Sequence, residues 1–166
     1  MNTVAPPLTF PDLLYLNDYN GDFGAYFNSV YDIFEAHFIK SNPLFMGIRV
    51  SAQRLPLVDN IHRTFYHITH EGEDENNRTP DFRRMERIRF PKFIIESCPH
   101  PDLLIWENIR GRDTRILIFN EATSYLIVLT KRNGYYLFWT AYFVEREHQK
   151  KKYIKEYKAY KNAKTA

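Results

Sequence analysis

The sequence predicts one α+β domain, in which a small antiparallel β-sheet lies between an amphipathic helix and a basic C-terminal helix. Three observations predict this fold class. Apolar residues recur at helical spacing from Phe23 to Phe38, three β-rich runs lie between Arg115 and Val144, and a lysine-rich segment follows from Glu145 to Ala163. With 166 residues, 44% of them hydrophobic, the chain has the size of a single domain over 1–166.

The N-terminal part (1–43) is predicted to form an amphipathic helix that packs on a core covering 44–164. Its apolar positions are three or four residues apart, which puts them on one helical face. These positions are Phe23, Phe27, Val30, Phe34 and Phe38. Pro43 ends the helix, because the residue before a proline avoids helical backbone angles.

Two strands are predicted before the polar loop Glu71–Asn77. Leu44–Ser51 has the composition of a short strand, and Arg63–Thr69 has the β-branched and aromatic residues of another. We expect these strands to extend the sheet beyond its meander, to a total of four or five strands.

A short helix is predicted after the polar loop, with Thr79 as its N-cap and Pro80 as its first residue. Pro91 would end this helix. Phe93–Ile95 is interpreted as a further short strand, and Cys98–Asp113 as mostly connection.

The three β-rich runs, Ile116–Phe119, Tyr125–Thr130 and Tyr135–Val144, predict an antiparallel meander. The dipeptide Asn133-Gly134 favours a two-residue type I′ turn between the last two runs. With this turn, the predicted opposed pairs are Lys131 with Tyr136, Leu129 with Phe138, Ile127 with Thr140, and Tyr125 with Tyr142. Thr140 and Tyr142 would then share a sheet face with Tyr125, and we expect that face to bind a ligand.

The C-terminal segment Glu145–Ala163 is predicted to be a helix with a tyrosine stripe facing inward and a basic face outward. From Glu145 to the end, eight basic residues accompany three acidic ones, so this tail carries +5 in a chain of net charge +3. Such a local basic face is suited to a polyanion. The inward stripe is Tyr153, Tyr157 and Tyr160, and the outward face carries His148, Lys151, Lys155 and Lys158.

Histidines and arginines are concentrated between His62 and Arg89. Imidazole titrates near neutral pH, and guanidinium is a planar fork that matches a phosphate, so the cluster suggests chemistry on a phosphodiester. Its members are His62, Arg63, His67, His70, Arg78, Arg83, Arg84, Arg87 and Arg89.

Other classes of protein are disfavoured. The single cysteine, Cys98, excludes an internal disulfide, and no stretch reaches the roughly 20 apolar residues of a membrane span. No signal peptide is evident, so we expect a cytoplasmic protein without a membrane partner. A zinc site at His67 and His70 is disfavoured because on the expected strand their rings would point to opposite faces. We therefore expect neither a metal nor a cofactor.

Three segments resemble a known family: FYHITHEG (Phe65–Gly72), RTPDFRRMERIRF (Arg78–Phe90) and YYLFWTAYFV (Tyr135–Val144). Together with His148 and the KEY motif at Lys155–Tyr157, they resemble the phage- and mobile-element-associated branch of nucleases with the barnase/EndoU/colicin E5-D/RelE-like (BECR) fold. Met85 stands where the family pattern has cysteine, and Phe90 where tryptophan is frequent; both are apolar. The resemblance implies a small sheet with helices on one side and a metal-independent RNase site on its exposed face.

The resemblance and the residue chemistry together suggest an endoribonuclease that cleaves RNA by acid/base catalysis, in the role of a toxin or phage-related effector. For such an effector, an antitoxin or immunity protein is an implied partner besides RNA. The expected catalytic residues are His67, Arg83, Arg87, Thr140 and Tyr142, and the expected RNA-binding residues are Arg84, Tyr125, His148, Lys151, Lys155 and Lys158.

Two other classes remain open at this level. The same cations and aromatic rings could bind nucleic acid without cleaving it, or the tyrosines could form the interface of a phage-related protein-interaction domain. Acidic neighbours could also neutralise the arginines. We expect Glu86 or the acidic loop Glu71–Glu75 to hold at least one of Arg83, Arg84 and Arg87 in a structural ion pair.

Overall fold

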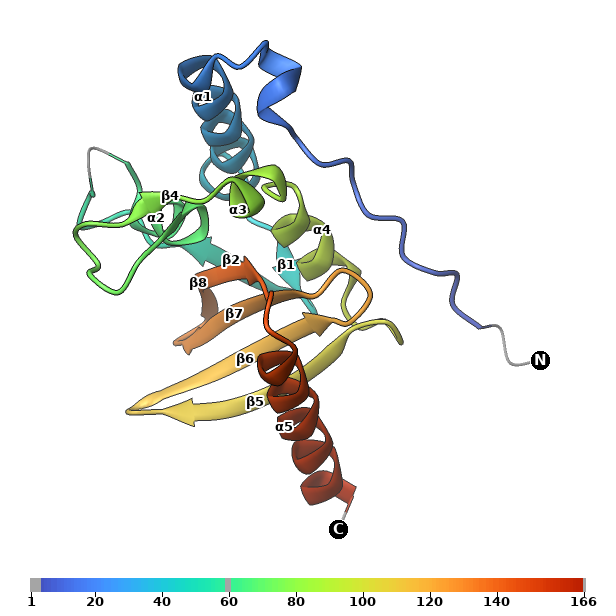
Figure 1. The fold of residues 1–166 in the computed structure, drawn as a ribbon. Coiled ribbons are helices and arrows are strands. Elements are labelled where there is room, and N and C mark those ends of the chain that lie inside the picture. The colour runs from blue at the N-terminus through green and yellow to red at the C-terminus, as the bar shows by residue number, and fades with distance from the viewer. Residues whose placement is uncertain (1–3, 59–60, 166) are drawn as a thin grey trace.

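The computed structural model describes residues 4–58 and 61–165, and its architecture is mixed α+β as predicted. Its centre is a six-stranded sheet in the order β1-β2-β8-β7-β6-β5 (Figure 1). β2 and β8 run parallel, and the other neighbouring pairs of this sheet are antiparallel. The strands are β1 Leu44–Phe45, β2 Ile48–Ala52, β5 Leu104–Arg110, β6 Asp113–Asn120, β7 Tyr125–Arg132 and β8 Tyr135–Phe143.

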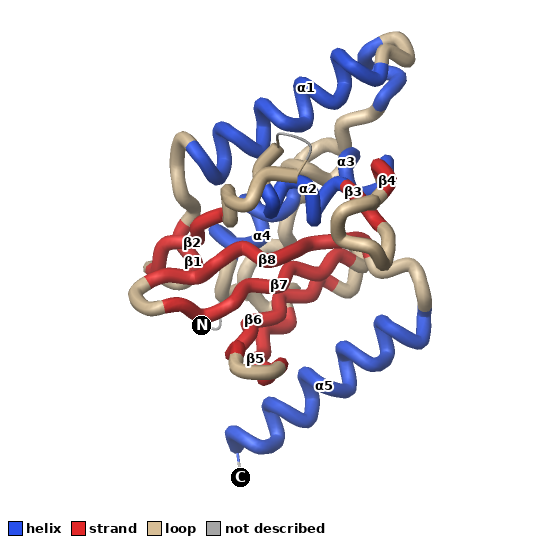
Figure 2. Tube along the Cα trace, turned by 90° about the vertical axis from the view of Figure 1, so that its left-hand side faces the viewer, coloured by secondary structure: helices blue, strands red, loops and turns tan. Residues whose placement is uncertain are grey.

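Helices lie on both faces of this sheet (Figure 2). The predicted first and last helices are confirmed, but α5 folds back over the second face, so the expectation of helices on one side alone is wrong. A small ribbon of β3 (His70–Glu71) and β4 (Thr79–Pro80) stands beside the sheet. The helices are η1 Leu16–Tyr19, α1 Phe23–Phe34, η2 Glu35–Ile39, α2 Arg63–Thr69, α3 Phe82–Glu86, α4 Phe90–Ser97 and α5 Glu147–Thr165.

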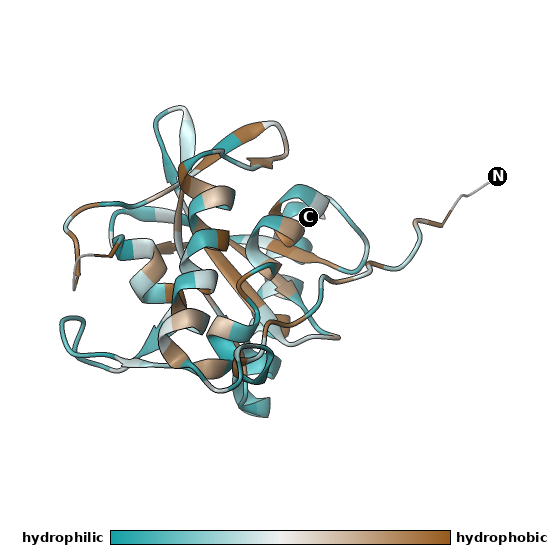
Figure 3. Ribbon diagram, turned by 90° about the horizontal axis from the view of Figure 1, so that it is seen from above, coloured by the Kyte–Doolittle hydropathy of each residue, from teal (hydrophilic) through white to brown (hydrophobic). Residues whose placement is uncertain are grey.

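Two apolar clusters hold the layers together. The larger joins α1, α2 and α4 to the sheet and includes Val30, Phe65, Ile94, Ile127 and Phe138. The smaller lies under α5, where the predicted stripe of Tyr153, Tyr157 and Tyr160 packs against Trp106, Leu117, Leu126 and Val128. In Figure 3, hydrophobic and hydrophilic positions alternate along the helices. This is expected of helices that pack one face on the sheet and turn the other to solvent. Within the described ranges, no helix is long and apolar enough to cross a membrane.

The segment Arg63–Thr69 is a helix, α2, and the predicted strand is wrong. Six consecutive residues of α2, from Thr64 onward, are buried. The Thr64 hydroxyl donates to the Phe138 carbonyl at 3.0 Å and accepts from the Gln53 amide at 2.7 Å, which ties α2 to β8 and to the end of β2. The preference of β-branched and aromatic residues for strands reflects how well they fit a half-buried sheet surface. It is therefore a poor guide for a segment such as α2, whose residues are buried on every side.

Three further boundaries differ from prediction. Phe93–Ile95 lies in α4, because Pro91 begins this helix instead of ending the previous one. Leu104–Arg110 forms β5, which pairs with β6 along its whole length. Asp81, not Thr79, caps α3, since its carboxylate accepts from the Arg83 and Arg84 amides.

The hairpin of β7 and β8 contains a β-bulge that changes its faces. Lys131 opposes Tyr136 and Leu129 opposes Phe138 as predicted, but Val128 opposes Thr140, so Trp139 is the extra residue of β8. Beyond the bulge the predicted register is wrong by one residue: Ile127 opposes Ala141, and Tyr125 opposes Phe143. Tyr125 therefore lies in the larger cluster, 2% exposed, and is not available to RNA on the face of Tyr142.

Candidate active site

A pocket of about 300 Å³ opens between α2, the polar loop after β3, and the bulged part of β8. The bulge makes this pocket, because without it Trp139 and Thr140 would point to opposite faces of the sheet. The lining residues are His67, Gly72, Glu75, Arg78, Arg84, Trp139, Thr140 and Tyr142.

His67 lies on the buried side of α2, with 5% of its surface exposed. Its Nε2 is 3.2 Å from Glu75 Oε1, and its ring centroid is 5.4 Å from that of Trp139. Burial, reinforced by the charge of Arg78, lowers the pKa of His67 to about 4, although Glu75 acts in the opposite direction. The imidazole is therefore neutral at pH 7.

The lowered pKa of His67 has a consequence for stability. The unfolded chain binds a proton at His67 as pH falls through about 6.5, whereas the folded chain binds it only near pH 4. The free energy of unfolding therefore falls as pH drops through this window, by roughly 2–3 kcal/mol in total. Urea unfolding of the wild type and of His67→Gln at pH 7 and pH 4.5 measures this contribution. The wild type should lose more stability than the variant, and equal losses would contradict the assigned environment.

The loop Gly72–Arg78 is held to α2 at its middle and at its C-terminal end. Glu75 Oε2 is 2.5 Å from Arg63 Nη2, and the Arg78 amide donates to the Tyr66 hydroxyl at 2.7 Å. At Gly72, φ is 142°, and a side chain there would meet the Arg78 backbone at 3.4 Å, so the glycine allows the two ends to approach. In the described part of the chain, Arg78 Nε is buried without a hydrogen-bond partner.

Arg84 lines the pocket and links the elements around it. Its Nη1 donates to the carbonyls of His67 and His70, each at 3.0 Å, and its Nε lies 3.3 Å from Asp81. The guanidinium also lies over the Tyr142 ring, 5.2 Å from its centroid. These contacts connect the end of α2 to α3, so Arg84 has a structural role.

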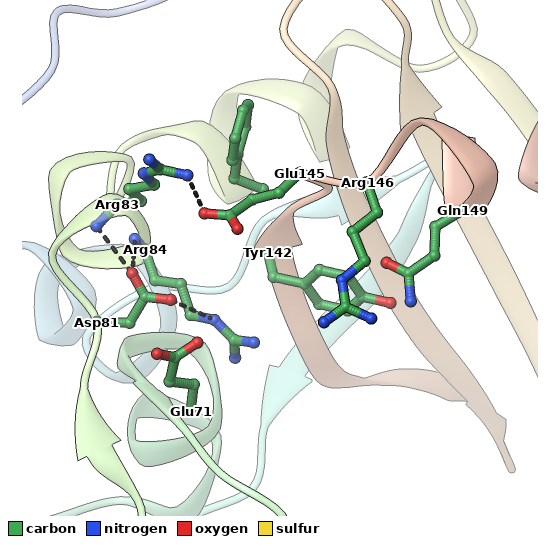
Figure 4. A pocket seen from close by; sticks show the side chains of 9 residues that line it. Glu71, Asp81, Arg83, Arg84, Tyr142, Glu145, Arg146 and Gln149 are labelled. Carbon is green, nitrogen blue, oxygen red and sulfur yellow. Dashed lines mark hydrogen bonds and ion pairs between the residues drawn. The ribbon is translucent and has the colours of Figure 1, made fainter. Parts of the chain in front are cut away.

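A second hollow of about 350 Å³ adjoins the first and shares Arg84 and Tyr142 with it (Figure 4). Arg83 is paired there with Glu145. Arg146 lies beside Tyr142 in Figure 4 and has no ion pair within the residues described. The Tyr142 hydroxyl is 2.6 Å from that of Tyr153, which fixes the ring against α5.

The structure thus brings four predicted residues, His67, Arg84, Thr140 and Tyr142, around one pocket, with Arg83 in the adjoining hollow. Arg87 lines neither. Its guanidinium lies 4.6 Å from the centroid of the Phe143 ring and 3.7 Å from Glu86, the kind of structural ion pair that we expected.

The predicted basic face of α5 is exposed but lines none of these hollows. It consists of His148, Lys151, Lys155 and Lys158. Sequence reasoning missed Glu75, Arg78, Trp139 and Arg146 as pocket residues. Glu75 lies in the polar loop, whose acidic residues were interpreted only as neutralising charges, and Arg78 follows that loop directly. His70, which was expected at the surface, is buried and stacks on Tyr66 at 4.5 Å.

In residues 4–58 and 61–165, no three His, Cys, Asp or Glu side chains come together as a metal site requires. No family model, curated protein or solved structure matches this chain.

Proposed function

We propose that the chain is a metal-independent endoribonuclease and that the pocket at His67 is its active site. The observation that carries this proposal is the contact of a neutral imidazole with a carboxylate, His67 with Glu75, beside Arg78, whose Nε is buried without a hydrogen-bond partner among the described residues. Cleavage of RNA without a metal needs a base for the 2′-hydroxyl, a donor for the leaving oxygen, and a cation for the phosphorane. This pocket contains a side chain suited to each role.

His67 acts as the base in this mechanism. The Glu75 carboxylate favours a proton on the nearby Nε2, which leaves the lone pair on Nδ1. Nδ1 accepts the 2′-hydroxyl proton, the 2′-oxygen attacks phosphorus, and the bond from phosphorus to the 5′-oxygen breaks. The imidazolium that forms is stabilised by the charge of Glu75, as a carboxylate does in hydrolase triads.

Arg78 stabilises the negative charge that develops on the phosphorane oxygens. We assign Tyr142 as the proton donor to the departing 5′-oxygen, because this residue lines both hollows. Thr140 donates a hydrogen bond to the phosphate, and Trp139 offers a ring on which a base stacks. The products are a 2′,3′-cyclic phosphate and a 5′-hydroxyl.

The motifs that resemble the phage-associated BECR nucleases support the same proposal, and they extend it to a toxin or phage-related effector with an antitoxin or immunity partner. An effector of this kind would arrest growth of the cells that express it. His67→Gln should relieve that arrest if it depends on the proposed site.

Incubation of the purified chain with mixed RNA in the presence of a chelator tests the proposed activity. We expect fragmentation by the wild type and none by His67→Gln. Binding without fragmentation would support a nucleic-acid-binding module instead. Neither binding nor fragmentation would leave the protein-interaction domain as the better interpretation.

A further inference from the structure

A second polar region lies on the same sheet face as Trp139 and Tyr142, farther from α2. Asn108 of β5, Arg115 of β6 and Thr130 of β7 are directly opposed across neighbouring strands, so they share one face. Arg115 lines two hollows there, of about 320 and 380 Å³. Tyr142 belongs to the first of these and Trp139 to the second, and both also line the pocket of His67. The hollows at Arg115 and the pocket of His67 are therefore neighbours on one face of the sheet, with Tyr142 and Trp139 between them.

Arg115 forms no ion pair among the described residues. It is half-buried, and within the described ranges no carboxylate lies at ion-pair distance from it. Its acidic neighbours are engaged elsewhere: Asp113 pairs with Arg132 at 3.2 Å, and Glu156 accepts from the Trp106 indole at 3.1 Å. Burial and the nearby Arg110 lower the pKa of Arg115, which means that its charge lies in an unfavourable environment. A bound anion would relieve this cost.

Three other side chains around Arg115 are suited to a bound nucleotide. Lys152 of α5 and Arg110 of β5 line the same hollow and add positive charge. Asn108 Oδ1 is buried and lacks a hydrogen-bond partner in the described part of the chain. Unsatisfied buried polar atoms are rare in folded proteins, and a ligand is one explanation for them.

We propose that Arg115, with Arg110 and Lys152, is a second phosphate-binding site, which binds the backbone of single-stranded RNA at a nucleotide neighbouring the scissile one. The inference rests on the proposed function and names its substrate class. Trp139, between the two sites, stacks a base, and stacking on a ring requires that this base be unpaired. A dinucleotide would fill only the pocket of His67, so tight binding requires a longer single strand.

Binding of a short 2′-O-methyl oligoribonucleotide, which cannot be cleaved, tests this site in the full-length chain. Arg115→Gln should weaken binding by about 10-fold and reduce the slope of log Kd against log salt by about 0.7, the value for one phosphate contact on a single strand. Arg112→Gln is the matched control. It makes the same charge change at the exposed turn between β5 and β6, outside these hollows, and should change Kd by less than about two-fold.

Lys152→Gln, on the exposed side of α5, is a second variant that does not alter the sheet, and it should weaken binding by about three-fold. Equal effects of Arg115→Gln and Arg112→Gln would overturn the phosphate site.

Cleavage of a dinucleoside monophosphate by Arg115→Gln separates the two proposals. Normal cleavage with weakened oligonucleotide binding is the expected result. If the wild type cleaves nothing while the selective binding loss persists, the active-site proposal fails and the anion site stands.

Discussion

Replacing His67 by glutamine should lower kcat for RNA cleavage by roughly 100-fold or more, the usual contribution of a general base. Glutamine can still contact Glu75 but cannot take up a proton at neutral pH. Since the phosphate contacts of Arg78 and Thr140 would remain, Kd for an uncleavable RNA should change by less than about three-fold. Single-turnover cleavage and fluorescence anisotropy measure the two quantities separately.

His148→Gln is the matched control for this prediction. His148 is exposed on α5 and lines neither hollow at the site, so its replacement should leave kcat within about two-fold of the wild type. A kcat that His67→Gln leaves unchanged, or one that the two variants lower equally, would contradict the role assigned to His67.

Replacing Arg84 by methionine should lower the free energy of unfolding by about 3 kcal/mol. The methionine fills much of the volume, but it leaves the His67 and His70 carbonyls without the Arg84 donor and Asp81 without its ion pair. Urea denaturation measures the loss.

Arg83→Met is the matched control for Arg84→Met, one residue away on α3. The Arg83 side chain is 58% exposed and pairs with Glu145 at the surface, so its loss should cost less than about 1 kcal/mol. Similar losses for the two variants would contradict the structural role of Arg84. Such a result would return Arg84 to the RNA-binding role that the sequence suggests.

The elements predicted correctly are those with a local, periodic signal. The stripe of α1, the tyrosine stripe of α5 and the position of the two-residue turn at Asn133-Gly134 each depend on residues near one another in sequence. The predicted type I′ geometry of that turn is wrong, because it requires a positive φ at both residues and only Gly134, with φ 83°, has one. α2 was missed because its helical conformation depends on burial between α1 and β8, which a seven-residue segment does not reveal.

The candidate site was predicted only in part, because some of its features depend on local sequence and others on contacts between distant segments. His67 and Tyr142 were identified by residue type and motif, and they do lie in one pocket. The bulge at Trp139 could not be read from the strand pattern, since one extra residue in β8 leaves the alternation of polar and apolar residues ambiguous. That single residue puts Thr140 and Tyr142 on the face of Trp139 and leaves Tyr125 on the opposite face.

Residue type alone also could not predict which arginines would form structural contacts. Arg78 and Arg84 are equally basic in sequence, but Arg84 contacts two carbonyls and Asp81, whereas Arg78 Nε has no partner among the described residues. The difference arises from contacts between α2, α3 and the polar loop, which are distant in sequence.

The chemistry of the cleaved ends tests the proposed RNase site most directly. The wild type, in chelator, acts on an oligonucleotide that is DNA except for a single ribonucleotide, and mass spectrometry identifies the new ends. A 2′,3′-cyclic phosphate on the fragment that ends in the ribonucleotide, with no cleavage of the all-DNA strand or by His67→Gln, is the predicted result. Cleavage that does not require the 2′-hydroxyl, or that persists in His67→Gln, would contradict it.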